Sequence, residues 1–173
     1  MIINTKEAAE LAAEYLTKQN SLRHIDKELL LKCANLSAVE LARLYGFPLI
    51  TYETIESDGR IPYGRLSKIP VDIFQVLQNG REVEFSLYDD YLLTEQGKVG
   101  VSYIYLPQYG EINDRLNFDS DGVETATVSY GAAADYCLKL RLFEEYAKWN
   151  ELYKEIISRT KGSKFQGGQN FQI

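Results

Sequence analysis

The stretch that decides the fold is Val99–Leu106 (VGVSYIYL), a strand-like run of β-branched and aromatic residues that ends at Pro107. An acidic loop follows it, and one continuous helical pattern then extends from about Thr125 to Ser158. A strand that leads into so long a helix predicts a sheet that is covered by part of that helix.

The residues before this block predict a helical hairpin. Asn4 followed by Glu7 is typical of a capped first helix. Asp26 predicts the cap of a second helix, and Gly46 followed by Pro48 predicts where that helix ends.

The apolar period changes to two from Leu49 to Pro107, which predicts an antiparallel meander of about four strands. Asn79-Gly80 is the strongest hairpin signal, because both central residues of a type I′ turn need positive φ. Ser57–Lys68 has the glycines and proline of a loop. Strands enclosed by helices predict the α+β class, with a helical hairpin, a meander and a long C-terminal helix.

The long helical pattern carries two apolar seams. One seam must cover the sheet, and the other meets either the N-terminal helices or another copy of the chain. Both alternatives stay open. Under the second one, the candidates for subunit–subunit contact are Leu142, Tyr146, Trp149 and Tyr153.

The composition excludes several classes of protein. A chain of 173 residues has the size of one domain, and its net charge of −6 disfavours binding of nucleic acid through the phosphates. No apolar run is long enough to span a membrane, and the N-terminus does not have the pattern of a secretory signal. Cys33 and Cys137 each lie in a helical pattern, which favours reduced, buried thiols in a cytosolic compartment.

The sequence lacks recognisable catalytic patterns. His24 is the only histidine, and no nucleophile motif, P-loop or dinucleotide-binding pattern accompanies it. Asp89-Asp90 is an acid pair on a predicted turn, where carboxylates normally face water. The acidic residues from Asp119 to Gly122 resemble the start of a calcium loop without its closing glutamate. We expect no enzyme activity, no cofactor and no metal site.

The sequence predicts a single α+β domain at residues 1–158. Residues 159–173 are expected to follow it as an extended docking arm. The arm contains no acidic residue, and its apolar residues alternate with Gly, Gln and Asn. Such an end either frays or lies as an extended peptide in a partner's groove or on a sheet edge. Apolar residues set between polar ones favour docking. The residues expected to carry it are Arg159, Lys161, Lys164, Phe165, Phe171 and Ile173.

Three segments in order resemble the head–tail connector, or adaptor, proteins of tailed bacteriophages, of the tail tubular protein A type. They are Val101–Pro107 (VSYIYLP), Tyr130–Leu138 (YGAAADYCL) and Phe143–Lys154 (FEEYAKWNELYK). The turn at Tyr45–Pro48 and the loop at Ile61–Pro70 fit the same order. The resemblance covers nearly the whole chain, and it depends on the order of the segments rather than on one motif.

The resemblance implies a structural virion protein at the head–tail junction, assembled in the cytoplasm of the bacterial host. It implies a homo-oligomeric ring of twelve subunits, with the portal protein above and a tail tube or nozzle protein below. Genomic double-stranded DNA would pass through the lumen without specific binding, and Lys161–Ile173 would dock on the portal. The alternative is a non-catalytic binding module whose tail recognises a host or phage partner.

The excess of acidic residues fits such a conduit, because negative walls repel phosphates and let DNA slide. The candidates for these lumen-facing walls lie in the loop after Pro107 and are Glu111, Asp114, Asp119 and Asp121. A closed ring needs heterologous contacts. We expect them at the spare seam of the last helix and at the edge of the meander.

Overall fold

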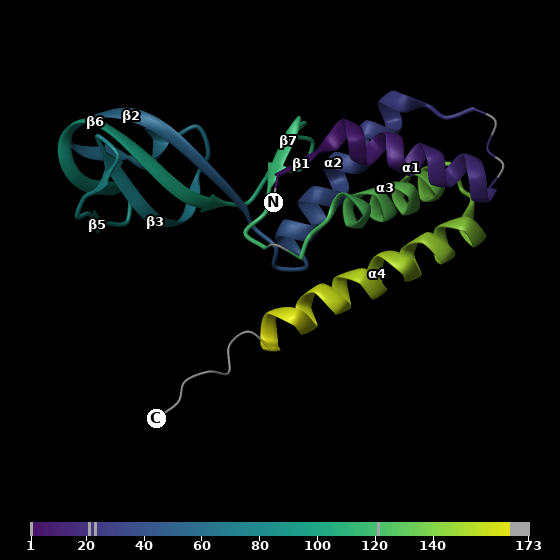
Figure 1. Cartoon of the computed structure of the whole chain (residues 1–173). Helices are drawn as coiled ribbons and strands as arrows, with labels where there is room; N and C mark the ends of the chain where they lie inside the picture. The colour runs from purple at the N-terminus through teal and green to yellow at the C-terminus, as the bar shows by residue number, and fades with distance from the viewer. Residues whose placement is uncertain (1, 21, 23, 121, 167–173) are drawn as a thin grey trace. The chain divides into compact units, whose positions relative to one another are not determined.

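The computed structural model describes residues 2–20, 22, 24–120 and 122–166, with only the backbone described at 19–20 and 162–166 (Figure 1). The chain divides into two compact units. The helical unit comprises Met1–Phe47 and Pro107–Ile173, and the β unit comprises Pro48–Leu106. The boundaries of the β unit coincide with the change of apolar period, so the period-two block forms a unit of its own. Helices together with antiparallel sheets confirm the α+β class.

The described residues of the helical unit form four helices and a two-stranded antiparallel sheet in which β1 pairs with β7. Helix α3 contacts each of the other three helices, and α1 also packs on α2. The elements of this unit are β1 (Ile2–Asn4), α1 (Thr5–Asn20), α2 (Lys27–Arg43), β7 (Arg115–Asn117), α3 (Thr125–Lys139) and α4 (Phe143–Gln166).

The predicted helical hairpin is confirmed together with its caps. The Asn4 side chain accepts hydrogen bonds from the backbone N–H groups of Lys6 and Glu7 at the start of α1. The Asp26 side chain accepts one from the Leu29 N–H, at 3.0 Å, at the start of α2. After α2 the chain turns at Gly46, which has φ of +76°. These bonds satisfy N–H groups that a helix leaves without a partner at its first turn.

Helix α3 packs closely on its neighbours because its middle consists of small residues. Gly131 and the three alanines that follow it are all buried. A Cβ atom placed on Gly131 would lie 2.1 Å from the Ser37 Oγ atom of α2 and 2.9 Å from the Tyr153 ring of α4. The absence of a side chain at Gly131 therefore sets how closely α2 and α4 approach α3.

The predicted continuous helix from Thr125 to Ser158 is wrong, because the chain breaks it at Leu140–Leu142. Arg141 adopts φ of +60°, and the Leu142 N–H donates to the Cys137 carbonyl at 2.9 Å. This is the hydrogen bonding of a helix end that usually contains glycine. Helix α4 then packs on α3. The single helix of the prediction is therefore two helices that pack against each other.

The extended conformation predicted for the arm is wrong at residues 159–166, because α4 continues to Gln166. Thr160 is only 8% exposed, and its hydroxyl donates to the Gly122 carbonyl at 3.1 Å. The Lys161 Nζ atom lies 5.5 Å from the centre of the Tyr45 ring. Phe171 and Ile173 lie outside the described residues.

In the β unit every strand pair is antiparallel, as the meander predicts. Strand β6 lies between β2 and β3, β4 pairs with β3, and β5 returns to β6. Residues 81–87 therefore pass from β3 to β6, and the sheet curls back on itself. The elements of this unit are β2 (Leu49–Pro62), η1 (Tyr63–Arg65), β3 (Pro70–Gln78), β4 (Arg81–Glu82), β5 (Ser86–Leu87) and β6 (Tyr91–Tyr105).

The type I′ turn is confirmed, since Asn79 and Gly80 have φ of +51° and +76° and join β3 to β4. The loop predicted from Ser57 to Lys68 is wrong over its first part, because β2 continues to Pro62. The register shifts between Asp58 and Arg60, where Gly59 has φ of +102°. The glycine marks a bulge within a strand here rather than a loop.

A buried tyrosine fastens the segment after η1 to the sheet. The Tyr103 hydroxyl donates to the Glu53 carboxylate at 2.5 Å and accepts from the Lys68 N–H at 3.1 Å. Glu53 also accepts from the Ser67 N–H at 2.9 Å. Burial, followed by the hydrogen bond to Glu53, raises the pKa of Tyr103 to about 12.

We predict that Gly131→Ala lowers the free energy of unfolding by about 1–3 kcal/mol, because the new methyl group must displace Ser37 and Tyr153. Urea unfolding of the whole chain measures the effect. Gly64→Ala is the matched control, since a Cβ atom there meets nothing within 4 Å. Equal stability of the two variants would contradict the close approach.

We predict that Tyr103→Phe lowers the free energy of unfolding by about 1–2 kcal/mol, because Glu53 and the Lys68 N–H lose their partner. The raised pKa of Tyr103 stabilises the fold below the unfolded value of 10.0, and this contribution is lost as pH rises to about 12. The difference between wild type and variant should therefore shrink over that interval. Tyr52→Phe, at an exposed position of β2, is the control. A difference that stays constant with pH would contradict the assignment.

Candidate interaction surfaces

Two of the four candidates for subunit contact are buried inside the helical unit. Trp149 and Tyr153 are each 2% exposed. The Trp149 ring stacks on Tyr15 and Tyr130, with ring centres 5.8 Å apart in both pairs. Tyr153 lies against α2, where its hydroxyl donates to the Ser37 carbonyl at 3.3 Å. The prediction is wrong for Trp149 and Tyr153, since a residue already covered by its own unit has no surface left for a second copy.

The other two candidates lie at the start of α4 and keep part of their surface. Leu142 and Tyr146 are half-buried. Tyr146 lines a groove of about 270 Å³ with residues of α2 and α3. Their role between subunits stays a prediction. The burial of Trp149 and Tyr153 corresponds to the intramolecular alternative for the second seam.

The acidic candidates for a lumen wall have different surroundings. Glu111 is half-buried and its carboxylate accepts from the Gln108 N–H at 3.1 Å, which closes the turn after Pro107. Asp114 and Asp119 are exposed on either side of β7. Asp121 lies outside the described residues. Which of them faces a lumen stays a prediction.

The catalytic candidates of the sequence are exposed side chains. His24 is exposed in the helical unit, and Asp89 and Asp90 are exposed on the turn before β6. The Asp90 carboxylate pairs with Arg60 at 3.5 Å. Within residues 2–20, 22, 24–120 and 122–166, no three His, Cys, Asp or Glu side chains gather as metal ligands would.

Both cysteines are buried and unpaired, as the sequence predicts. Burial raises the pKa of the Cys137 thiol to about 11 and raises that of Cys33 further above its ordinary value. Both thiols therefore stay protonated near neutral pH, and a protonated thiol is a poor nucleophile.

A partly exposed stack of two tyrosine rings and a guanidinium lies in the β unit. The Arg60 guanidinium carbon lies 3.7 Å from the centre of the Tyr91 ring. Tyr91 stacks on Tyr88 with ring centres 4.6 Å apart. The Tyr63 hydroxyl donates a hydrogen bond to the Tyr88 carbonyl at 2.8 Å. Arginine and tyrosine are the residues most often found at the centre of protein interfaces. Sequence reasoning missed this stack, because β2 and β6 bring together positions some 30 residues apart.

The outer edge of β3 is a second exposed surface. Ile69, Val71 and Phe74 are all exposed, and Ile69 reaches 73%. Strand β3 pairs with β6 along its length, whereas on its other side only residues 76–78 bond to the segment that contains β4 and Val83. An apolar edge of this kind is suited to pairing with another chain. It corresponds to the edge of the meander that the sequence predicts as a contact.

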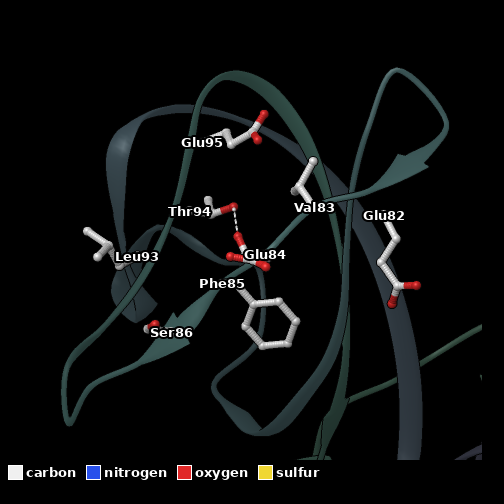
Figure 2. A pocket seen from close by; sticks show the side chains of 8 residues that line it. All are labelled: Glu82, Val83, Glu84, Phe85, Ser86, Leu93, Thr94 and Glu95. Atoms are coloured by element: carbon white, nitrogen blue, oxygen red, sulfur yellow. Dashed lines mark hydrogen bonds between the residues drawn. The ribbon is translucent and has the colours of Figure 1, made fainter.

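A hollow of about 860 Å³ lies in the β unit between residues 82–86 and residues 93–95 (Figure 2). We call it the acidic trough. Its lining contains three glutamates and no basic residue. The lining residues are Glu82, Val83, Glu84, Phe85, Ser86, Leu93, Thr94 and Glu95. In Figure 2 the three carboxylates lie apart from one another rather than gathered at one point. This spread suits a surface that faces a basic partner better than it suits a site for one ion.

The chain matches no protein-family model, and no curated protein is similar to it. None of the described helices combines the length and the hydropathy that crossing a membrane requires.

We predict that Trp149→Ala lowers the free energy of unfolding of the isolated chain by about 3–5 kcal/mol, because a large buried ring leaves a cavity. Urea unfolding of the chain at low concentration measures it. Phe143→Ala, at an exposed position of the same helix, should change stability by less than about 0.5 kcal/mol. An unchanged stability of Trp149→Ala would contradict the burial of this residue in its own unit and would make it a candidate for subunit contact again.

Proposed function

We propose that this chain is a structural adaptor of the head–tail connector of a tailed bacteriophage, with no catalytic role. The observation that carries the proposal is the ordered resemblance of three segments. Val101–Pro107 contains the end of the central strand β6, Tyr130–Leu138 lies in α3, and Phe143–Lys154 lies in α4. The resemblance therefore involves the elements that organise both units rather than one exposed motif.

The proposed assembly is a ring, for which we carry over the twelve subunits that the resemblance implies. The portal protein lies on one side of the ring and a tail tube or nozzle protein on the other, inside the virion after assembly in the host cytoplasm. The apolar edge of β3 and the stack of Arg60, Tyr91 and Tyr88 support this role, since they offer separate surfaces for neighbouring proteins.

The charge of the chain supports passage of DNA without specific binding. The net charge is −6, and Asp114 and Asp119 are exposed in the loop proposed for the lumen. Phosphates are repelled by such a wall, so DNA passes without the counterion release that would hold it.

The docking arm of the proposal is shorter than the sequence alone predicts. Because α4 includes residues up to Gln166, only 167–173 are left to dock on the portal as an extended peptide. Within this segment Phe171 and Ile173 alternate with polar residues, which suits a peptide bound in a groove or on a sheet edge.

A second candidate function is a non-catalytic binding module for a host or phage protein. The stack of Arg60, Tyr91 and Tyr88 favours it, because such a stack can bind a partner protein without the chain forming an oligomeric ring. The two functions differ in the partner that they require.

The experiment mixes the purified chain with the portal protein of the same phage and measures the mass of the complex and its image by electron microscopy. We expect a closed ring of this chain on the portal. Phe171→Ser with Ile173→Ser should abolish capture and leave the urea midpoint unchanged. Gln169→Ser with Gln172→Ser is the matched control and should be captured normally. A chain that ignores the portal, or that binds it without its last residues, would contradict the proposal.

A further inference from the structure

We infer that the outer face of the Tyr88 ring is a docking site for an arginine side chain of a partner protein, with the Asp89 carboxylate pairing with its charge. Both residues lie in the β unit, in the hairpin between β5 and β6. The inference goes beyond the proposed function, because it names the chemical group that is bound and holds for an adaptor and for a binding module alike.

The structure already contains one arginine bound in this way. The Arg60 guanidinium carbon lies 3.7 Å from the centre of the Tyr91 ring, and the same guanidinium pairs with the Asp90 carboxylate at 3.5 Å. A guanidinium can make both contacts at once, because its flat face covers a ring while its N–H groups point outward to a carboxylate. An arginine, a tyrosine ring and the aspartate next to that tyrosine therefore form one binding arrangement within the chain.

Tyr88 and Asp89 mirror Tyr91 and Asp90 on the other side of the stack. The Tyr88 ring lies against the Tyr91 ring, with centres 4.6 Å apart and planes inclined by 6°. Two groups this close to one ring centre cannot share a face, so Arg60 and Tyr88 cover opposite faces of Tyr91. Tyr88 is 48% exposed although Tyr91 covers one of its faces. Its other face therefore supplies much of that exposed surface and can receive a second guanidinium.

The backbone of the hairpin holds the Tyr88 ring in place. The Tyr88 N–H donates to the Tyr91 carbonyl at 2.9 Å, and the Tyr88 carbonyl accepts from the Tyr63 hydroxyl at 2.8 Å. The Tyr63 N–H in turn donates to the Asp90 carbonyl at 3.0 Å. Since both backbone groups of Tyr88 are bonded, its position is set before a partner arrives. Binding then costs little conformational entropy on this side of the contact.

The charge of the hairpin favours a cation. Residues 58–63 and 86–91 together contain three acidic side chains and one basic side chain. The basic one, Arg60, pairs with Asp90, whereas Asp89 is exposed and pairs with no cation among the described residues. An arginine would thus meet an open ring beside a net negative charge. A nucleobase could stack on the same ring, but its phosphate would be repelled by the carboxylates.

The site is tested by titrating a blocked glycine–arginine–glycine tripeptide into the isotope-labelled whole chain. We expect saturable shifts of the Tyr88 ring signals and of the amide signals of residues 88–91. The matched lysine tripeptide should bind about two- to fivefold more weakly, because an ammonium has no flat face to lie on the ring. Equal binding of the two peptides would show attraction by charge alone and overturn the inference. Binding of the matched tyrosine tripeptide in place of the arginine one would also overturn it.

Substitutions locate the binding site. Tyr88→Leu and Asp89→Asn should each weaken binding of the arginine tripeptide about two- to fivefold, and Tyr88→Phe, which keeps the ring, should bind as the wild type does. Tyr52→Leu and Asp72→Asn are the matched controls, since they change an exposed tyrosine and an exposed carboxylate of the same unit. Both controls should bind normally. Because Asp89→Asn alters one exposed side chain, it tests the site even where Tyr88→Leu disturbs the fold. Unchanged binding by Asp89→Asn would overturn the inference.

These outcomes are separate from those of the portal experiment. The titration contains no portal protein, so a chain that ignores the portal can still bind the arginine tripeptide, and the docking site then stands. A chain that forms a ring on the portal but binds the arginine and lysine tripeptides equally keeps the adaptor role and loses the docking site.

Discussion

The close approach of α3 to its neighbours is the constraint on which the helical unit depends. Gly131 has no side chain, so Ser37 of α2 and Tyr153 of α4 reach the α3 backbone. Tyr153 and Trp149 are buried on the same helix as a result, and Trp149 also covers Tyr15 of α1. The tight packing of α3 therefore gives the unit its core.

The turn between α3 and α4 decides which face of α4 is buried and which is exposed. Arg141 adopts the left-handed conformation that reverses the chain, and the Leu142 N–H bonds back to the Cys137 carbonyl. Folding back turns one seam of α4 into the core and exposes Lys148, Leu152 and Arg159 on another side. A straight helix would present the seam with Trp149 instead. The surface chemistry of α4 thus follows from a single turn.

The β unit acquires its candidate surfaces from the way in which the sheet curls. Strand β6 pairs with β2 and β3 and also with β5, so residues 81–87 have to cross from β3 to β6. The crossing interrupts the strand at residues 83–85 and opens the acidic trough. None of this was predictable from the sequence, since Glu82 and Glu84 alternate with apolar residues as in any exposed strand, and Glu95 lies between polar residues. The stack of Arg60 and Tyr91 depends in the same way on pairing between distant strands.

The sequence by itself determined the features that neighbouring residues create. The caps at Asn4 and Asp26 and the turn at Asn79-Gly80 were predictable, because their bonds and φ angles involve residues a few positions apart. The α+β class followed from the same local periods. Only the tertiary structure decided that Arg141 reverses the chain and that the seam of α4 is covered by its own unit. The physical reason is that burial depends on which surfaces meet, and an apolar seam has the same sequence whether its partner is α1 or another copy.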